Sequence, residues 1–100
     1  MVYSLIGMWE VLEHRRVSRK LSRLPLEVLK RYEKWKDIVR ISGPQGLRLI
    51  RGFRDEALRG EWRGQRSSRL GLQHRVIYRV VAQEVVVEVI DLSAHDYRRR

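Results

Sequence analysis

The chain has 100 residues, enough for one domain with a single modest core, and its 22 Lys and Arg against 12 Asp and Glu give a formal net charge of +10. It has no cysteine, which excludes disulfides, thiolate zinc sites and a cysteine nucleophile. No apolar run approaches the roughly 20 residues of a membrane helix. A small, strongly basic domain favours a nucleic-acid or ribosomal partner, and an acidic protein partner also fits this charge.

The cations and the N-terminal segment refine these expectations. From residue 51 onward every cation is an arginine, whose planar fork suits phosphate and stacks on bases. The absence of cysteine fits a reducing cytoplasm, and the first ten residues, MVYSLIGMWE, lack the regions of a signal peptide. We therefore expect a cytoplasmic protein without a membrane segment, in which residues 1–100 form a single domain. Met8 is an alternative start to Met1.

The N-terminal part of the chain indicates a strand followed by a helix. Residues 8–14, MWEVLEH, alternate weakly between apolar and polar side chains and suit a short first strand. Val17, Leu21 and Leu24 follow at helical spacing, which predicts an amphipathic helix with a very basic outer face. Pro25 interrupts this pattern and suits the first position of a second helix.

Residues 26–41 carry the clearest helical signal, and Gly43 and Pro44 end it. One face of this helix is lined by large apolar residues: Val28, Tyr32, Trp35 and Val39. The spacing of Tyr32 and Trp35 suits either a base-stacking platform or core packing. Their position on the apolar face favours the core.

Residues 43–62 are ambiguous between a short helix and an extended connector. Three strand candidates follow, over residues 62–70, 72–82 and 85–92, with short connections that make them antiparallel neighbours. The expected fold is therefore α+β, with two N-terminal helices packed on one face of a small antiparallel sheet, and with room for a short N-terminal strand.

Alternation along the second of these strands separates two faces. One set reads as the face toward the helices: Leu72, His74, Val76, Tyr78 and Val80. The other set reads as the open face: Gln73, Arg75, Ile77, Arg79 and Val81. Arg75 is thus expected at mid-sheet on the open face. Arg66 and Arg69 alternate oppositely, so only one of them shares that face with Arg75.

Few residues in the chain suit proton transfer. No histidine pair has metal-ligand spacing and no phosphate-binding glycine loop occurs, so we expect neither a metal nor a cofactor. What remains is arginine, histidine, tyrosine and glutamate, which suits metal-free RNA cleavage. There the ribose 2′-OH is the nucleophile, and the protein supplies a base, cations for the phosphorane and an acid. A lone histidine such as His95 is, taken by itself, more often a surface or capping residue.

The stretch GEWRGQRSSRLGLQHRVIYRV, followed by a valine-rich strand and the tripeptide HDY, resembles the RelE/ParE toxin superfamily of toxin–antitoxin systems. It is most similar to the RelE, HigB and YoeB-like branch, through an L-x-G-x-W-x-G-x-R-S-x-R-L pattern that begins at Leu58. The resemblance implies a toxin that is an mRNA endonuclease (an mRNA interferase), cuts messages in the decoding A site of the small ribosomal subunit, and so inhibits translation. It also implies a cognate antitoxin as partner.

The resemblance also implies roles for individual residues. Arg75 matches the arginine that steadies the scissile phosphate, and Glu56 falls where YoeB-like members have a general-base glutamate. His95 and Tyr97 fall near a C-terminal pair that serves in acid–base or stacking roles. Four further arginines are expected to bind RNA or phosphate: Arg54, Arg66, Arg69 and Arg79.

Several alternatives stay open at this stage. Asp96 separates His95 from Tyr97, whereas YoeB-like toxins end in adjacent His-Tyr. The general base could be shifted by a position or two relative to Asp55. Arg75 has a structural alternative as a cross-strand partner of Glu88. A ParE-like inhibitor of DNA gyrase without nuclease activity, or a plain RNA-binding domain, is the rival function.

Overall fold

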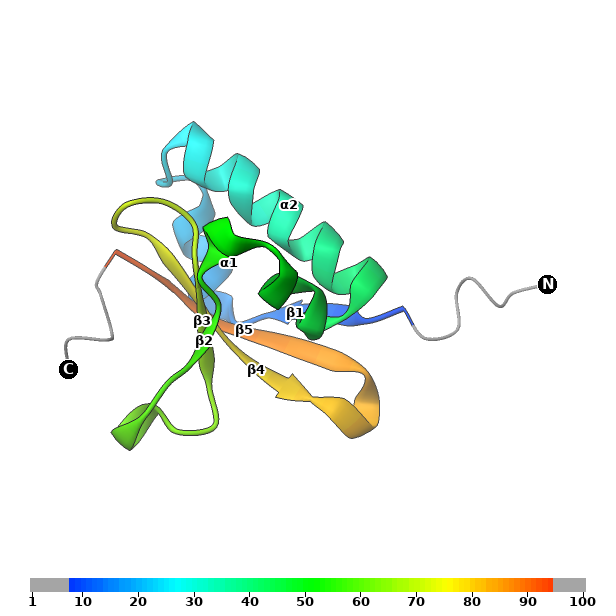
Figure 1. The fold of residues 1–100 in the computed structure, drawn as a ribbon. Helices are drawn as coiled ribbons and strands as arrows, with labels where there is room; N and C mark the ends of the chain where they lie inside the picture. Colours follow the sequence, from blue (N-terminus) through cyan, green and yellow to red (C-terminus); the bar gives the residue numbers. More distant parts are fainter. Residues whose placement is uncertain (1–7, 95–100) are drawn as a thin grey trace.

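The computed structural model describes residues 8–94, which form a five-stranded sheet with two helices on one face (Figure 1). The elements in chain order are β1 Glu10–Glu13, α1 Arg15–Leu21, α2 Leu26–Ser42, β2 Glu56–Ala57, β3 Arg66–Arg69, β4 Arg75–Val81 and β5 Val86–Ser93. The predicted α+β class, both helices and the short N-terminal strand are confirmed. No helix in this part of the chain is long and apolar enough to span a bilayer.

The sheet is mixed, whereas the sequence predicted an antiparallel one. Its strand order is β1-β5-β4-β3-β2, and the neighbours from β2 to β5 pair antiparallel, as the short connections predicted. β1 instead pairs parallel to β5, with Glu10 opposite Val86 and Glu13 opposite Val89. Parallel pairing needs a long connection between the two strands, and both helices and three strands lie between β1 and β5.

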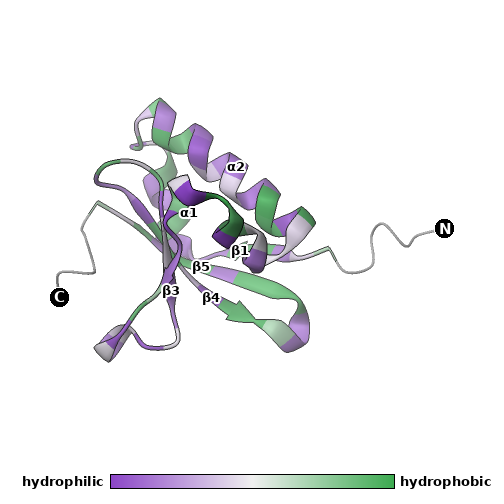
Figure 2. Cartoon of the chain, viewed as in Figure 1, coloured by the Kyte–Doolittle hydropathy of each residue, from purple (hydrophilic) through white to green (hydrophobic). Residues whose placement is uncertain are grey.

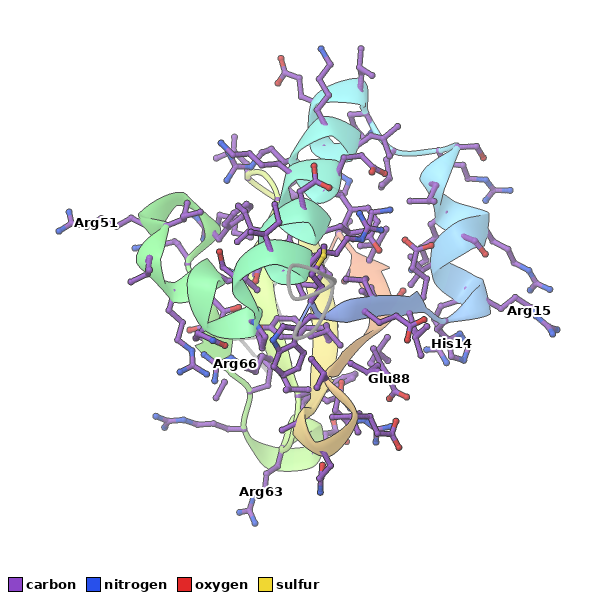
Figure 3. The ribbon with its side chains drawn as sticks, turned by 90° about the vertical axis from the view of Figure 1, so that its right-hand side faces the viewer. His14, Arg15, Arg51, Arg63, Arg66 and Glu88 are labelled. Atoms are coloured by element: carbon purple, nitrogen blue, oxygen red, sulfur yellow. The ribbon has the colours of Figure 1, made fainter. Side chains whose placement is uncertain are left out.

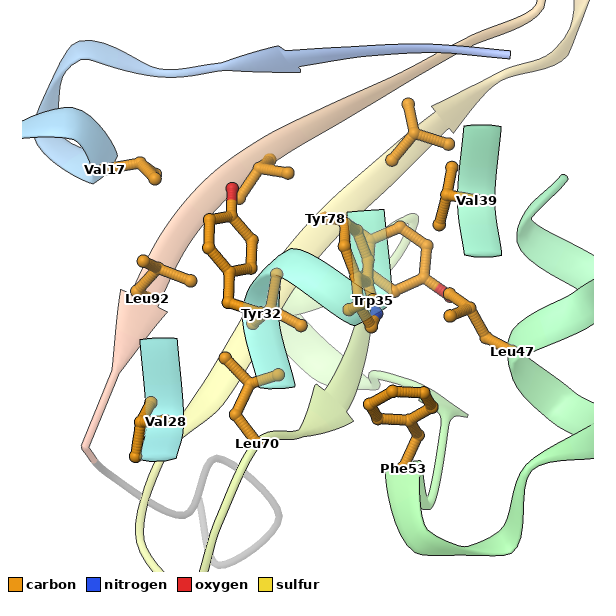
Figure 4. Packing of buried hydrophobic residues seen from close by; sticks show 13 residues of the cluster. Val17, Val28, Tyr32, Trp35, Val39, Leu47, Phe53, Leu70, Tyr78 and Leu92 are labelled. Atoms are coloured by element: carbon orange, nitrogen blue, oxygen red, sulfur yellow. The ribbon is translucent and has the colours of Figure 1, made fainter. Parts of the chain in front are cut away.

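The core lies between α2 and the central strands. Trp35 and Tyr32 are both fully buried, which confirms core packing over a base-stacking platform. The Trp35 ring stacks on Tyr32 with a centroid separation of 6.0 Å and meets Tyr78 edge-on at 5.2 Å (Figure 4). β4 and β5 are the most apolar part of the sheet, whereas β3 is polar (Figure 2).

A charged contact ties the edge strand β1 to α2. The Tyr32 hydroxyl donates to Glu13 Oε2 over 2.6 Å, and Lys36 Nζ lies 3.3 Å from the same oxygen. Lys36 also lies over the Tyr32 ring, 4.7 Å from its centroid. Among the strands of the described part of the chain, β1 neighbours β5 alone, so these side-chain contacts add to the backbone bonds that hold it.

The connector before β3 and the turn before β4 differ from the predicted strands. Residues 43–62 form short 3₁₀ turns around the two-residue strand β2, and β3 begins at Arg66 rather than at residue 62. Strand pairing ends where Arg69 lies opposite Arg75, so the residues between them form the turn. Leu72 is therefore 96% exposed at the tip of this turn and not on the face toward the helices.

The β4–β5 turn contains a strained residue. Val85 has φ 56°, a left-handed conformation that costs a β-branched residue about 1–2 kcal/mol. Asparagine tolerates this conformation, so Val85→Asn should raise the free energy of unfolding by about 1 kcal/mol in urea denaturation. The matched control is Val81→Asn at the other end of the turn, where φ is −110° and no such gain is expected. A loss of stability in Val85→Asn as large as in the control would contradict this account.

Candidate functional site

The sheet face opposite the helices, here called the open face, brings together four polar residues from three strands. Directly opposed residues of an antiparallel pair lie on the same face. Glu56 of β2 lies opposite Ser67 of β3, and Arg69 of β3 lies opposite Arg75 of β4. Ser67 and Arg69 are two residues apart on one strand, so all four share the open face. We call Glu56, Ser67, Arg69 and Arg75 the Arg75 cluster.

Arg75 is held in place by neighbours from two other strands. Its Nη1 donates to Ser67 Oγ over 3.2 Å and lies 3.8 Å from Glu56 Oε2. The Arg75 side chain lies on the open face as predicted, but the residue is only 3% exposed and so is not displayed to solvent. A buried guanidinium needs such partners, because leaving its charge unpaired away from water is costly. The Glu56 side chain is 35% exposed.

The structural alternative for Arg75 is wrong, because a different arginine pairs with Glu88. Register places Arg79 opposite Glu88, and Arg79 Nε donates to Glu88 Oε1 over 3.0 Å, with Nη2 in contact with the same oxygen. Arg79 is an exposed ion-pair residue four positions along β4 from Arg75. The structure does not place it in the Arg75 cluster.

The other predicted residues occupy different places. Arg69 is opposite Arg75, whereas Arg66 is opposite Tyr78 on the face toward the helices, so the expectation that only one of them shares the open face is confirmed. Arg54 is exposed at the turn before β2. His95 and Tyr97 lie outside the described residues.

A fully buried carboxylate lies next to Glu56 in the sequence. Asp55 Oδ1 accepts from Arg66 Nε over 2.8 Å and lies 2.7 Å from Arg66 Nη2 in an ion pair, while Oδ2 accepts from the Ser68 hydroxyl over 2.6 Å and from the Tyr78 hydroxyl. The Ser68 hydroxyl also accepts from Trp35 Nε1 over 2.9 Å. The Asp55 carboxylate therefore lies in the interior, and the Glu56 carboxylate lies on the open face.

The sequence did not reveal the parts that Ser67 and Ser68 play in the site, and it raised Asp55 only as an alternative position for the general base. Ser67 and Ser68 are consecutive and fully buried, one facing Arg75 and the other facing Asp55. Consecutive serines in a strand place one hydroxyl on each face of the sheet. Because buried hydroxyls are almost always hydrogen-bonded, such a pair indicates a hydrogen-bond partner on each face. The partners themselves lie far along the chain.

The Asp55 carboxylate changes the titration of its neighbours. Burial alone would lower the pKa of Arg66, but the hydrogen bonds and charge of Asp55 more than offset it, so that the pKa lies above its ordinary value. Burial, followed by the charge of Asp55 and the hydrogen bond to it, raises the pKa of the Tyr78 phenol. Burial and the hydrogen bond to Glu13 likewise raise the pKa of the Tyr32 phenol.

These two phenols predict a loss of stability in alkali. Because their pKa values are raised in the folded chain, their contribution is fully present below about pH 10, where an unfolded tyrosine is still protonated. Above about pH 10 the unfolded chain releases these protons and the folded chain keeps them, so stability falls by up to about 1.4 kcal/mol per pH unit for each tyrosine. Urea denaturation between pH 9 and 11 should show this slope, and Tyr32→Phe should reduce it. An unchanged slope in Tyr32→Phe would contradict this assignment.

Neither described histidine is brought into the Arg75 cluster. His14 precedes α1 and its Nδ1 accepts from the Arg16 backbone N–H over 3.1 Å, which makes it a helix cap. His74 lies half-buried in the turn before β4, where its carbonyl accepts from the Leu70 N–H over 2.8 Å. Within residues 8–94 no group of three or more histidine, aspartate or glutamate side chains is arranged to hold a metal ion.

Comparison with known proteins gives matches among solved structures. No protein-family model and no curated protein sequence matches the chain. A chain of the archaeal RelE–RelB complex from Pyrococcus horikoshii OT3 is 27% identical, with a TM-score of 0.68 over 86% of this chain and 93% of that one. A chain of the RelBE2 toxin–antitoxin complex from Mycobacterium tuberculosis is 22% identical, with a TM-score of 0.64 over 89% and 99%.

A third structure extends the likeness in fold. The YoeB/ParE toxin from Agrobacterium tumefaciens is 18% identical, with a TM-score of 0.70 over 87% of this chain and 99% of that chain. In all three the match spans nearly the whole of both chains. The strand order and helix placement, the sequence pattern from Leu58 to Tyr78 and the likeness to the archaeal RelE–RelB structure together place this chain in the RelE/ParE-like toxin superfamily.

Proposed function

We propose that this chain is the toxin of a toxin–antitoxin system and that it acts as a ribosome-dependent mRNA endonuclease. The observation that carries the proposal is the pairing of Glu56 Oε2 with Arg75 Nη1 at 3.8 Å on the open face, with Arg69 opposite Arg75. A carboxylate and a guanidinium at this separation match the spacing of the 2′-OH and the phosphate of one nucleotide. Because Arg75 is only 3% exposed in the free chain, the proposal requires its guanidinium to become accessible when RNA binds. The solved toxin–antitoxin complexes with this fold support the toxin role.

The proposed reaction needs no metal. Glu56 accepts the proton of a ribose 2′-OH, and the resulting oxygen attacks the adjacent phosphorus. Arg75, assisted by Arg69, stabilises the negative charge of the phosphorane. The bond to the 5′-oxygen then breaks, which leaves a 2′,3′-cyclic phosphate on one fragment and, after proton transfer, a 5′-hydroxyl on the other. The superfamily resemblance assigns the acid–base or stacking roles at this step to His95 and Tyr97.

Burial of Arg75 strengthens the attraction between its positive charge and a phosphorane. Electrostatic attraction between a cation and a developing phosphorane strengthens as water is excluded. The hydrogen bond from Arg75 Nη1 to Ser67 Oγ fixes the orientation of the guanidinium before substrate arrives. Ser67 is itself fully buried, so this contact is shielded from water.

The ribosome supplies what the chain lacks, namely an oriented substrate. The Arg75 cluster lies on a sheet face, and the side chain of Glu56, the proposed general base, is only partly exposed. Flexible free RNA would therefore rarely present a 2′-OH to Glu56 in line for attack. Basic side chains project from several sides of the molecule, among them Arg15, Arg51 and Arg63 (Figure 3). With a net charge of +10, the chain suits both ribosomal RNA and an antitoxin that covers its basic surface.

The test is cleavage on ribosomes that carry a defined message, beside the same message free in solution. The proposal expects cleavage of the ribosome-bound message, at least about 100-fold slower cleavage of free RNA, and product ends that are a 2′,3′-cyclic phosphate and a 5′-hydroxyl. Addition of the cognate antitoxin should stop the reaction. If the messages stay intact, two further assays distinguish the rival functions. Inhibition of DNA gyrase by the chain would replace this proposal by the ParE-like one, and normal growth of cells that express the chain would leave a plain RNA-binding domain.

A further inference from the structure

The buried carboxylate of Asp55 has no direct part in the proposed reaction. Its side chain is 0% exposed and accepts three hydrogen bonds, one each from Arg66, Ser68 and Tyr78, and it also forms an ion pair with Arg66 Nη2. A buried aspartate is rare unless it is paired and fully hydrogen-bonded, as this one is. Its donors come from β3 and β4, whereas Asp55 itself directly precedes β2.

The strand that carries Glu56 is short, and beyond it the Leu58 N–H donates to the Gln65 carbonyl over 2.9 Å. β2 contains only Glu56 and Ala57 and pairs with β3 at those two positions alone. It is also an edge strand, and within residues 8–94 its second side has no strand neighbour. A two-residue edge strand is a weak support for a side chain that must be placed to within about an ångström. The side chain of Asp55 adds contacts that connect this segment to β3 and β4.

Alternation of side chains links the buried network to the Arg75 cluster. Along the chain Asp55 points into the interior and Glu56 to the open face, while on β3 Ser68 points into the interior and Ser67 to the open face. Asp55 bonds to Ser68, and Ser67 bonds to Arg75. The hydrogen bonds on the interior side therefore set the spacing of the groups on the open face.

We propose that Asp55 is a positioning residue, whose buried hydrogen bonds to Arg66, Ser68 and Tyr78 hold β2 so that the Glu56 carboxylate lies beside Arg75. This inference rests on the proposed function, because it assigns Asp55 an effect on cleavage that passes through Glu56. A residue that acts only through Glu56 should matter little once Glu56 can no longer act as a base.

The experiment is a double-mutant cycle on ribosome-bound mRNA with Asp55→Asn and Glu56→Gln, alone and combined. Asp55→Asn keeps the size of the side chain but removes its charge. We expect it to lower the maximal cleavage rate by about 10- to 100-fold in the otherwise wild-type chain, because small misplacements of a reacting group have large effects. In the Glu56→Gln background it should change the rate by less than about twofold. Half-saturating ribosome concentrations should stay the same throughout.

The cycle separates failure of this inference from failure of the proposed function. If Glu56→Gln cleaves as fast as the wild-type chain, the assignment of Glu56 as base fails, and the positioning role fails with it. If Glu56→Gln is slow but Asp55→Asn lowers the rate equally in both backgrounds, Asp55 only stabilises the fold. The proposed function would then stand without the positioning role.

Two milder variants and one control complete the design. Ser68→Ala and Tyr78→Phe each remove a single donor to Asp55, and each should show the same dependence on Glu56 with a smaller effect, so the test stands even if Asp55→Asn does not fold. Glu88→Gln removes a partly exposed carboxylate that pairs with Arg79 on the same sheet and should leave the cleavage rate unchanged. Additive effects of Ser68→Ala and Tyr78→Phe with Glu56→Gln would overturn the inference.

Discussion

Replacement of Arg75 by alanine should lower the rate of mRNA cleavage on ribosomes by about 100- to 1,000-fold, the typical effect of removing a group that stabilises transition-state charge. Arg75 contacts both Ser67 and Glu56. Arg75→Lys keeps a positive charge but loses the planar fork, so it should recover only part of the rate. The measurement is single-turnover cleavage at saturating ribosomes.

The matched control for this loss is Arg40→Ala. Arg40 lies on α2, away from the open face, and forms an ion pair with Asp37. Arg40→Ala removes one positive charge, as Arg75→Ala does. It should leave the cleavage rate within about twofold of the wild-type value. Equal losses in Arg75→Ala and Arg40→Ala would show that overall charge, rather than the Arg75 cluster, determines activity.

Replacement of Trp35 by alanine should have the largest effect on stability, about 3–5 kcal/mol. Trp35 is fully buried, contacts the rings of Tyr32 and Tyr78, and donates a hydrogen bond to Ser68. Small domains have total stabilities of only about 5–15 kcal/mol, so this variant should lose much or all of its folded population. Urea denaturation followed by circular dichroism measures the loss.

Two other substitutions bracket the expected loss for Trp35→Ala. Trp35→Phe keeps an aromatic ring in the core and removes the N–H that Ser68 accepts, so it should cost about 1–2 kcal/mol. Leu72→Ala removes a large apolar side chain at the exposed turn before β4 and should cost less than about 0.5 kcal/mol. If Trp35→Ala left the free energy of unfolding unchanged, the core would not be centred on this residue.

The helices and central strands could be predicted because their signals are local. The helical spacing of Val28, Tyr32, Trp35 and Val39 predicted both α2 and its buried face. Alternation along β4 predicted that Tyr78 is buried and that Arg75 lies on the opposite face. The parallel pairing of β1 with β5 could not be predicted in this way, because periodicity shows that a strand exists but not which strand lies beside it.

The interior of the candidate site was not predictable for a related reason. Asp55 bonds to Tyr78, 23 residues away, and Trp35 bonds to Ser68, 33 residues away. The sequence left Asp55 and Glu56 as competing positions for the general base, and the hydrogen bonds of Asp55 to β3 and β4 distinguish them. The burial of Arg75 likewise depends on its neighbours across the sheet, Ser67 and Glu56. Alternation places a side chain on a face but does not say what covers it.

The most direct test of the central claim is to induce the chain in growing cells and map new mRNA 5′ ends against the reading frame, with the wild-type chain beside Arg75→Ala. We expect 5′-hydroxyl ends inside translated regions, in register with codons, that are absent in Arg75→Ala. Growth arrest with intact messages and DNA damage, or identical 5′ ends in both strains, would contradict it.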